Sequence, residues 1–386
     1  MLKGLCVVDF SRYLPGPFAS LRLADLGAEV IKVEPPKGGD PARQMGGEVG
    51  GAGLLFLANN RGKKSVSINF KEKAGQELAF KLASKADVVI ESFRPGVADA
   101  LGIGYQALKN VKPDLIYCSL TGFGQSGLFS DLGSHDLNYM ALSGLLVQLK
   151  DQQGRPVQPC FQFADMIGGI GASEAILAAL VKRSLTHEGS YLDFAMVDTL
   201  IGMMTLHSLI QKVAGTGYGI SEITGGIIAY NIYETGDGRY LSLGALEKKF
   251  WVNFCQGVNK EDWIKDHFSP ANADNATYLD LVKLFKSRTL AEWAEFGLKV
   301  DCCLMPILEA NEMMSHDYVL SKGLVWEQKT DSWGNLLQVS TSVGGVDNRE
   351  TAKEPPALGQ HTNEVLQKLL GATPAQIEDW SKQGLI

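Results

Sequence analysis

Two side chains in this sequence have neighbours that suit acid–base chemistry. His135 lies in the polar turn 133–138 ahead of a predicted helix, and Asp165 follows Phe163 and Ala164 at the start of an apolar helix. A carboxylate in apolar surroundings is costly unless it is hydrogen-bonded or has a raised pKa. Each residue also has an ordinary interpretation, because a lone histidine is usually a surface residue and an aspartate at a helix start is commonly its cap.

Two further acids and a group of basic residues are weaker candidates. Asp136 directly follows His135, and its simplest role is a helix cap. Glu247 precedes Lys248 and Lys249, so its simplest interpretation is a solvated acid that balances these lysines. Arginine and lysine are the usual phosphate ligands. The residues that could serve in this way are Arg61, Lys63, Lys64, Lys71 and Arg94.

The composition is that of a globular protein and excludes several classes of partner. The chain has 386 residues, of which 45% are hydrophobic and 20% charged, with a net charge of −7. This charge gives no electrostatic footprint for nucleic acid or an anionic membrane. We expect no signal peptide and no membrane span. The six cysteines are scattered, which predicts reduced thiols, a cytoplasmic location and no metal site.

The chain opens with the pattern strand, helix, strand. The apolar run 5–10 predicts a strand, 19–26 a helix that Gly27 ends, and 29–34 the next strand. Such a βαβ unit is typical of a parallel sheet with a right-handed crossover. The alternation continues and predicts a doubly wound α/β domain. The further predicted elements are helix 74–85, strands 87–90 and 115–120, and helices 166–182 and 195–214.

The residues after Gly217 change in character. A hairpin that turns at Gly236-Asp237-Gly238 is followed by two helical stretches rich in tryptophan and lysine, over 250–265 and 278–298. The sequence therefore predicts a second, smaller α+β domain and a tail that ends in a helix. The predicted boundaries are 1–215 for the large domain, 222–321 for the small domain and 322–386 for the tail.

A nicotinamide-binding function is disfavoured by the first loop. Glu34 ends the second strand, where an acid could bind a ribose. The fingerprint G-x-G-x-x-G is missing, however, and Pro15-Gly16-Pro17 stands in its place. Because proline has no backbone N–H, it cannot offer the amide that cradles a pyrophosphate.

A series of different short motifs is spread along almost the whole chain. They are Val8-Asp9-Phe10, Pro15-Gly16-Pro17, 26–34, Gly39-Asp40-Pro41-Ala42-Arg43, 60–66, Glu91-Ser92-Phe93-Arg94-Pro95-Gly96, Thr121-Gly122-Phe123-Gly124 and 358–366. Together they resemble the family that holds the class III CoA-transferases and the alpha-methylacyl-CoA racemases. The resemblance implies a Rossmann-like large domain to which the tail returns, an interlocked homodimer, and an active site between the large domain of one chain and the small domain of the other.

The resemblance also implies where an acyl-CoA substrate would bind, with no separate cofactor. One departure concerns adenine, because relatives usually carry arginine after the acid that ends the second strand. Here Pro35 follows Glu34, and Lys37 is the nearest substitute, though it stacks less well. The implied CoA contacts are Lys37, Ile68, Asn69, Phe70, Lys71, Ser92, Phe93, Arg94, Leu137, Asn138 and Tyr139.

Within the family the racemase branch is favoured. The segment from His135 to Tyr139 resembles the racemase motif, and the glycine-rich flap of formyl-CoA transferase is absent. The implied mechanism inverts the carbon alpha to a thioester with His135 and Asp165 as two acid/base groups. Asp136 and Glu247 would orient His135, and amides after Asp165 would meet the enolate oxygen.

Two other functions remain open. The loop at Gly39-Asp40-Pro41-Ala42-Arg43 is more usual among transferases. In that branch Asp165 would be a nucleophile that forms covalent intermediates while CoA moves to a free carboxylate. A non-enzymic acyl-CoA binder would need only the large-domain pocket and would not need His135.

Overall fold

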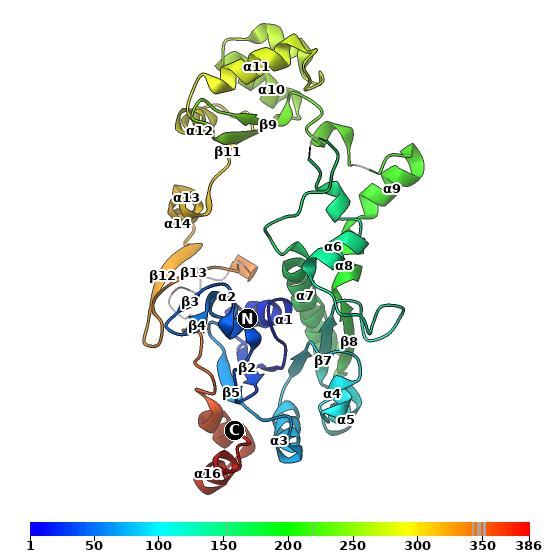
Figure 1. Ribbon diagram of the computed structural model, residues 1–386, viewed down its shortest axis with the longest axis vertical. Coiled ribbons are helices and arrows are strands. Elements are labelled where there is room, and N and C mark those ends of the chain that lie inside the picture. The colour runs from blue at the N-terminus through cyan, green and yellow to red at the C-terminus, as the bar shows by residue number, and fades with distance from the viewer. Residues whose placement is uncertain (152, 218, 342, 346–348, 350–352) are drawn as a thin grey trace. The chain divides into compact units, whose positions relative to one another are not determined.

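The chain forms two compact units in the computed structural model (Figure 1), which describes all residues except 152, 218, 342, 346–348 and 350–352. Unit 1 comprises Met1–Met204 together with Asp317–Ile386, and unit 2 comprises Thr205–His316. Unit 2 is therefore inserted between two sequence segments that build unit 1.

Unit 1 is built on a six-stranded parallel sheet, which confirms the predicted α/β class. The strand order is β5-β2-β1-β6-β7-β8, and every neighbouring pair is parallel. The two edge strands, β5 and β8, have no counterpart in the sequence prediction. The strands are β1 Cys6–Asp9, β2 Glu29–Glu34, β5 Lys64–Ser67, β6 Val88–Glu91, β7 Ile116–Thr121 and β8 Ser190–Ala195.

The first helix, α1 (Pro15–Asp25), begins earlier than the sequence predicts. Pro15 occupies the first turn of the helix, where the missing N–H has no intrahelical partner to lose. Gly27 follows the helix with φ +99°, a backbone conformation that side-chain-bearing residues rarely adopt. The chain then enters β2 beside β1, with Val7 paired to Val30.

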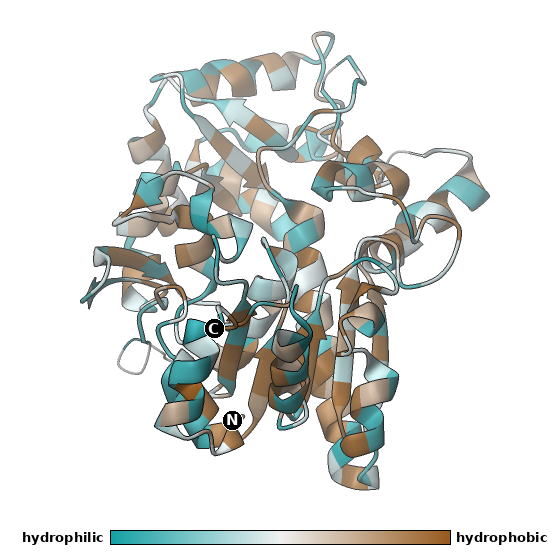
Figure 2. Ribbon diagram, turned by 60° about the horizontal axis from the view of Figure 1, so that its bottom comes forward, coloured by the Kyte–Doolittle hydropathy of each residue, from teal (hydrophilic) through white to brown (hydrophobic). Residues whose placement is uncertain are grey.

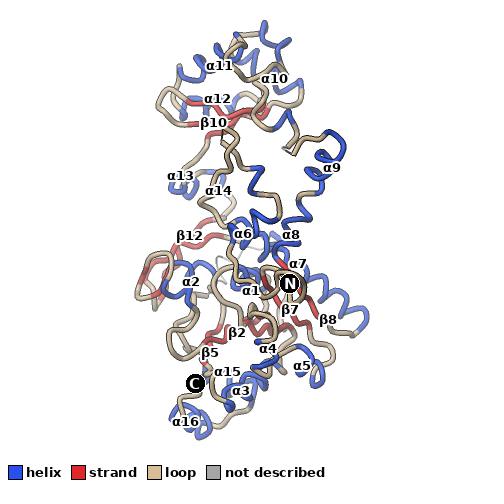
Figure 3. The backbone as a smooth tube through the Cα atoms, turned by 45° about the vertical axis from the view of Figure 1, so that its right-hand side comes forward, coloured by secondary structure: helices blue, strands red, loops and turns tan. Residues whose placement is uncertain are grey.

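Helices cover both faces of the sheet, because alternate strand residues point to opposite sides. Val8 and the other strand residues on its face of the sheet pack with α3, α5, α15 and α16. Val7 and the strand residues on the opposite face pack with α1, α6, α7 and α8. Figure 3 shows the strands between these two groups of helices, and Figure 2 shows that the strands are largely hydrophobic. The helices are α3 Lys73–Ala83, α5 Tyr105–Val111, α6 Asp136–Leu142, α7 Phe163–Thr186, α8 Met196–Met203, α15 Thr362–Leu370 and α16 Pro374–Lys382.

The end of the chain docks on the edge strand β5. The backbone N–H of Ser67 donates to Oγ1 of Thr362 at 2.9 Å, and that of Ser65 donates to Nδ1 of His361 at 3.2 Å. The N–H of His361 returns a hydrogen bond of 2.9 Å to the carbonyl of Ser65. Residues from the tail thus satisfy the β5 edge of the sheet.

Short elements complete unit 1. The glycine-rich segment after β2 folds into the 3-10 helix η1, a small hairpin and α2. The tail contributes a second hairpin, which pairs Val325 with Val339. The elements are η1 Pro41–Gln44, β3 Glu48–Val49, β4 Ala52–Gly53, α2 Leu54–Asn59, α4 Val97–Ala100, η2 Leu146–Gln148, α14 Asp317–Ser321, β12 Val325–Thr330, β13 Gly334–Val339 and η5 Val343–Gly345.

Unit 2 has a three-stranded antiparallel sheet, in the order β11-β10-β9, packed against helices around Trp251 and Trp293. The predicted hairpin turn is present, with the N–H of Thr235 bonded to the carbonyl of Arg239 at 2.8 Å. The predicted helix 278–298 is two helices, because Thr289 starts a new one with a capping box. The elements are α9 Thr205–Ala214, η3 Ser221–Ile223, β9 Tyr230–Glu234, β10 Tyr240–Gly244, α10 Lys248–Gly257, η4 Glu261–Asp266, α11 Ala276–Lys286, α12 Leu290–Lys299, β11 Leu304–Pro306 and α13 Ala310–Ser315.

One helix has membrane-like length and composition. By these two criteria alone, α7 is long and apolar enough to cross a membrane, and no other helix of the described residues is. Core helices pass the same test, and α7 contributes Ala164, Ala172, Ile176 and Ala179 to the buried face of the sheet.

Candidate active site

A hydrogen bond joins the first turns of α6 and α7 in unit 1. Oδ1 of Asp136, the first residue of α6, accepts from the backbone N–H of Asp165 at 3.0 Å. Asp165 is the third residue of α7, which Gln162 precedes as N-cap residue. The interpretation of Asp165 as a helix cap is therefore wrong. Its N–H is one of the donors that a helix start leaves without an intrahelical partner, and Asp136 satisfies it.

The two carboxylates perturb each other and a neighbouring phenol. Burial, followed by the negative charge of Asp136, raises the pKa of Asp165 to about 7. Burial, followed by the charges of Asp165 and Asp136, raises the pKa of Tyr139 to about 12. The hydroxyl of Tyr139 donates to the carbonyl of Ser134 at 2.8 Å, which ties the turn before α6 to the helix. Near neutral pH, the Asp165 carboxyl is poised between its two protonation states.

His135 stands at the start of α6, next to this carboxylate pair. It occupies the N-cap position, and its backbone N–H donates to Oδ1 of Asn138 at 3.1 Å. Its side chain is exposed, as are those of Leu137 and Asn138. The fold thus brings His135, Asp136 and Asp165 together at two adjoining helix starts.

Glu247 lies in unit 2, away in sequence from the other candidates. It is the N-cap residue of α10 and is exposed. Its charge contributes to the raised pKa of Cys303, so these two residues are neighbours within unit 2. The carboxylate of Asp136 makes its hydrogen bond to Asp165, and no bond to the His135 ring is present among the described residues. The roles of Asp136 and Glu247 in orienting His135 stay predictions.

The amides expected to face an enolate oxygen are already used. The N–H of Asp165 bonds to Asp136, and the N–H of Met166 bonds to the carbonyl of Gln162 at 3.1 Å. Residues after Asp165 lie within the helix, whose backbone donors bond to carbonyls one turn earlier. The expectation of free amides after Asp165 is therefore wrong. The positive end of the α7 dipole still lies at this point.

The segment 92–94, directly after β6, has one polar side chain bonded within unit 1 and one exposed to solvent. Oγ of Ser92 accepts from the backbone N–H of Arg12 at 3.1 Å. Phe93 is half-buried, with the Arg12 guanidinium 5.6 Å from its ring centroid. Arg94 is exposed, and its guanidinium lies where a side chain at Gly133 would be, two residues before His135. The segment 92–94 therefore adjoins the turn that carries His135.

Of the predicted CoA contacts at 37 and 68–71, some stabilise the fold and others are exposed. Ile68 and Phe70 lie in the hydrophobic core. Asn69 holds the C-terminus, since its backbone N–H donates to the carbonyl of Leu385 at 2.8 Å. Lys71 and Lys37 have exposed side chains that are available to a ligand.

Three of the five basic candidates are committed to internal partners. Arg61 is buried and ion-pairs with Asp25, and Lys63 is buried within 3.4 Å of Asp9. Lys64 bridges two glutamates, Glu29 at 2.8 Å and Glu364 at 2.6 Å. Their assignment as phosphate ligands is therefore wrong, because each cation is already neutralised.

Glu34 also has an internal role. It accepts from Nε of Arg43 at 2.7 Å and from Nη2 of Arg43 at 2.8 Å, and it is fully buried. The Arg43 guanidinium lies 3.6 Å from the ring centroid of Phe56. This pairing fixes the glycine-rich segment to the end of β2.

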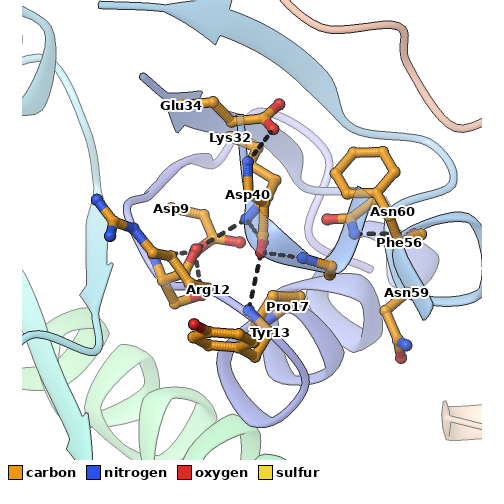
Figure 4. A network of polar contacts seen from close by, with 12 residues as sticks. Asp9, Arg12, Tyr13, Pro17, Lys32, Glu34, Asp40, Phe56, Asn59 and Asn60 are labelled. Atoms are coloured by element: carbon orange, nitrogen blue, oxygen red, sulfur yellow. Dashed lines mark hydrogen bonds and ion pairs between the residues drawn. The ribbon is translucent and has the colours of Figure 1, made fainter. Parts of the chain in front are cut away.

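A buried network of charges holds the loop 11–17 against Lys32 and Asp40 (Figure 4). Lys32 contacts Oδ2 of Asp40 at 2.9 Å and donates to the carbonyl of Ser11 at 2.8 Å. Oδ1 of Asp40 accepts from the N–H of Tyr13 at 3.0 Å, and Tyr13 has φ +65°. Arg12 lies in this loop, and its guanidinium has no acidic partner among the described residues. It was not among the predicted site residues, and the motifs on either side of it were the only sequence signal.

The family model for CoA-transferase family III matches residues 2–362. The chain belongs to CoA-transferase family III. Members of this family act on acyl-CoA substrates, so an acyl-CoA-processing enzyme is established. The resemblance stated from the motifs is confirmed at this level.

Curated relatives divide between two activities at equal identity. The chain is 32% identical over 395 residues to succinyl-CoA:glutarate CoA-transferase of Mus musculus, covering all of this chain and 90% of the relative. It is 32% identical over 382 residues to alpha-methylacyl-CoA racemase of Mus musculus, covering 95% of this chain and 93% of the relative. A CAIB/BAIF family protein from Brucella suis has a similar fold, with a TM-score of 0.80, 28% identity and coverage of 95% and 99%.

Proposed function

We propose that this family member is a racemase that inverts the alpha carbon of 2-methyl-branched acyl-CoA thioesters. The observation that carries the proposal is the carboxyl of Asp165, whose pKa burial and Asp136 raise to about 7, beside the helix-capping His135. General acid–base catalysis is most efficient when the pKa of the catalytic group lies near the working pH.

In this mechanism two groups flank the alpha carbon. One group removes the proton alpha to the thioester carbonyl, and the other returns a proton to the opposite face of the enolate. His135 and Asp165 are the proposed pair, with one deprotonated and the other protonated at the start of each turnover. The α7 dipole, positive at its first turn, would stabilise the developing negative charge. Tyr139 is a proposed substrate contact next to the pair.

The CoA moiety is proposed to bind along the segment that contains Ser92, Phe93 and Arg94. Arg94 is exposed and Arg12 lies over the Phe93 ring, so two guanidinium groups are available for phosphate oxygens. Lys71 and Lys37 are the further exposed cations. Adenine recognition would rely on Lys37, since Pro35 occupies the position after Glu34.

An interlocked homodimer is part of the proposal. It would bring Glu247 of one chain's unit 2 towards the His135 and Asp165 of the other chain. The helix α9 supports an intermolecular contact, because Leu206, Leu209 and Val213 share one face of the helix and are all about half exposed or more. An apolar stripe of this kind normally faces a partner surface.

A CoA-transferase is the second candidate, because the mouse transferase is as similar to this chain as the mouse racemase. Asp165 would then attack the thioester as a nucleophile. A nucleophilic carboxyl must be deprotonated, whereas the Asp165 carboxyl has a pKa raised to about 7 by burial and by Asp136. Near neutral pH such a carboxyl is partly ionised and suits either role, so the neighbouring His135 is the feature that favours the acid–base role.

The deciding experiment is incubation with one epimer of a 2-methylacyl-CoA in heavy water. A racemase produces the other epimer and incorporates deuterium at the alpha carbon. The competing result is CoA transfer to an added dicarboxylate such as glutarate, with neither inversion nor deuterium uptake over a panel of branched substrates. That result would replace the racemase with the transferase.

A further inference from the structure

One buried acid of unit 1, Glu91, differs from the other four in its charged neighbours. Those four lie within ion-pair distance of a cation, as expected since an isolated buried charge is strongly unfavourable. Glu91, at the end of β6, is 1% exposed and has no cationic partner among the described residues. The paired acids are Asp9 with Lys63, Asp25 with Arg61, Glu34 with Arg43 and Asp40 with Lys32.

Glu91 lines a cavity of about 250 Å³ within unit 1. One wall is aromatic: the rings of Tyr105 and Tyr191 stack with centroids 4.9 Å apart, and Tyr117 lies 5.8 Å from the first and 6.0 Å from the second. Asp99 adds a second carboxylate to the lining. None of the lining residues is basic, and the cation beside the aromatic wall is Lys109, whose ammonium lies 5.5 Å from the Tyr105 ring centroid. Aromatic faces and carboxylates both attract cations.

The same cavity contains a donor that lacks an acceptor. Nε2 of Gln125 is shielded from solvent and makes no hydrogen bond. A shielded donor without an acceptor costs about 1–3 kcal/mol. The carboxylate of Glu91 accepts from the backbone N–H of Phe93 at 2.7 Å and is also hydrogen-bonded to the Ser119 side chain, which fixes its position at the cavity. The cavity therefore offers a negative charge to a small guest and has an amide donor without an acceptor in its lining.

The surrounding charges favour an organic cation over a metal ion. Burial most of all, and then Asp99 and Asp193, raise the pKa of Glu91 to about 7. Among the described residues, no group of three or more His, Cys, Asp or Glu side chains could hold a metal ion. Phenol faces with one deep carboxylate match an alkylammonium group.

We propose that this cavity is a second binding site, which takes a small protonated amine carrying a hydrogen-bond acceptor. The ammonium group pairs with Glu91 and lies against the tyrosine wall, while the acceptor bonds to Nε2 of Gln125. The site is separate from the proposed acyl-CoA site, although the backbone N–H of Phe93 links Glu91 to the segment 92–94.

The test is a calorimetric titration of the full chain, without acyl-CoA, with 4-aminobutan-1-ol and with its uncharged analogue 1,4-butanediol. At pH 8 the amine is protonated and Glu91 is mainly ionised. We expect saturable binding of the amine and none of the diol. Glu91→Gln, which keeps the shape and removes the charge, should weaken amine binding at least about ten-fold.

Two further variants make the result specific. Gln125→Leu removes the donor and should also weaken binding of the amino alcohol, which keeps the test usable if Glu91→Gln does not fold. Glu77→Gln makes the same chemical change on the exposed face of α3 and should leave binding unchanged. The proposal is overturned if the amine shows no saturable binding in the millimolar range, if the diol binds equally well, or if the folded Glu91→Gln or Gln125→Leu variant binds as wild type does.

Discussion

The carboxylate of Asp136 accepts a hydrogen bond from the backbone N–H of Asp165 at 3.0 Å, and this bond joins the two helix starts of the candidate site. The contact fixes a second acid beside a catalytic candidate. It therefore acts on the chemistry through charge as well as through position.

Replacing Asp136 by asparagine should lower the pKa of Asp165. Burial is the larger cause of the raised pKa, and the negative charge of Asp136 is the second. The substitution removes this charge and keeps an oxygen that can accept the backbone N–H of Asp165. Any pH dependence of alpha-deuteration that reports Asp165 should move to lower pH. The measurement is the pH profile of exchange in Asp136→Asn against wild type, and an unmoved profile would contradict the coupling.

Asp165→Asn should stabilise the fold more at pH 8 than at pH 4. The folded pKa of about 7 lies above the unfolded value of roughly 3.9, so the native state binds more protons between these two pH values. Stability contributed by this group is therefore present at low pH and is lost as pH rises towards 7. Urea unfolding at both pH values measures the difference, with Asp131→Asn in an exposed loop as control.

The two proposed bases should be separable by isotope exchange. His135→Ala should abolish inversion, with a loss of at least roughly 10²–10⁴-fold, while deuterium still enters the epimer whose proton faces Asp165. Asp165→Asn should show exchange from the other epimer only. In a transferase, Asp165→Asn would be inactive and His135→Ala largely active. Near wild-type inversion by His135→Ala would rule out the two-base assignment.

Arg94→Ala should weaken CoA binding by about 1.5–3 kcal/mol, the range for hydrogen bonds to charged groups. Lys64→Ala is the matched control, because Lys64 is bound to Glu29 and Glu364 and should not contact the ligand. Calorimetry with CoA compares the two variants. Equal affinity in wild type and Arg94→Ala would remove this segment from the binding site.

Sedimentation should find a dimer at every practical dilution. Two interlocked chains cannot separate without partial unfolding, so dilution alone should not release a monomer. A stable monomer that retains activity would be incompatible with the proposed assembly. Leu209→Lys, on the exposed apolar face of α9, should destabilise the dimer, while Lys212→Ala on the same helix should not.

The sequence predicts the four central strands of the sheet, β2, β1, β6 and β7, because each carries its own apolar signal. The apolar run of β2 is predicted with its observed limits, Glu29 to Glu34. The edge strand β8 was missed because Tyr191 and Asp193 alternate with apolar residues only over a short span next to a helix. A half-covered strand of this kind has a weak pattern.

The candidate site was harder to predict because side-chain partners are distant in sequence. Motifs pointed to His135 and Asp165, but not to the bond between Asp136 and the Asp165 backbone. Lys63 looked like a phosphate ligand until its partner, Asp9, 54 residues away, was seen beside it. Local sequence reveals that a charge is present, but only the fold reveals which opposite charge neutralises it.

The docking of His361 and Thr362 on β5 has a consequence for synthesis on the ribosome. Ser65 and His361 are separated by 296 residues, so the edge of β5 would wait roughly 15–60 s for its cover at ordinary rates of chain elongation. An uncovered strand edge is a template for pairing with another nascent chain. A chain terminated before His361 would keep that edge open permanently, and we expect such a product to aggregate.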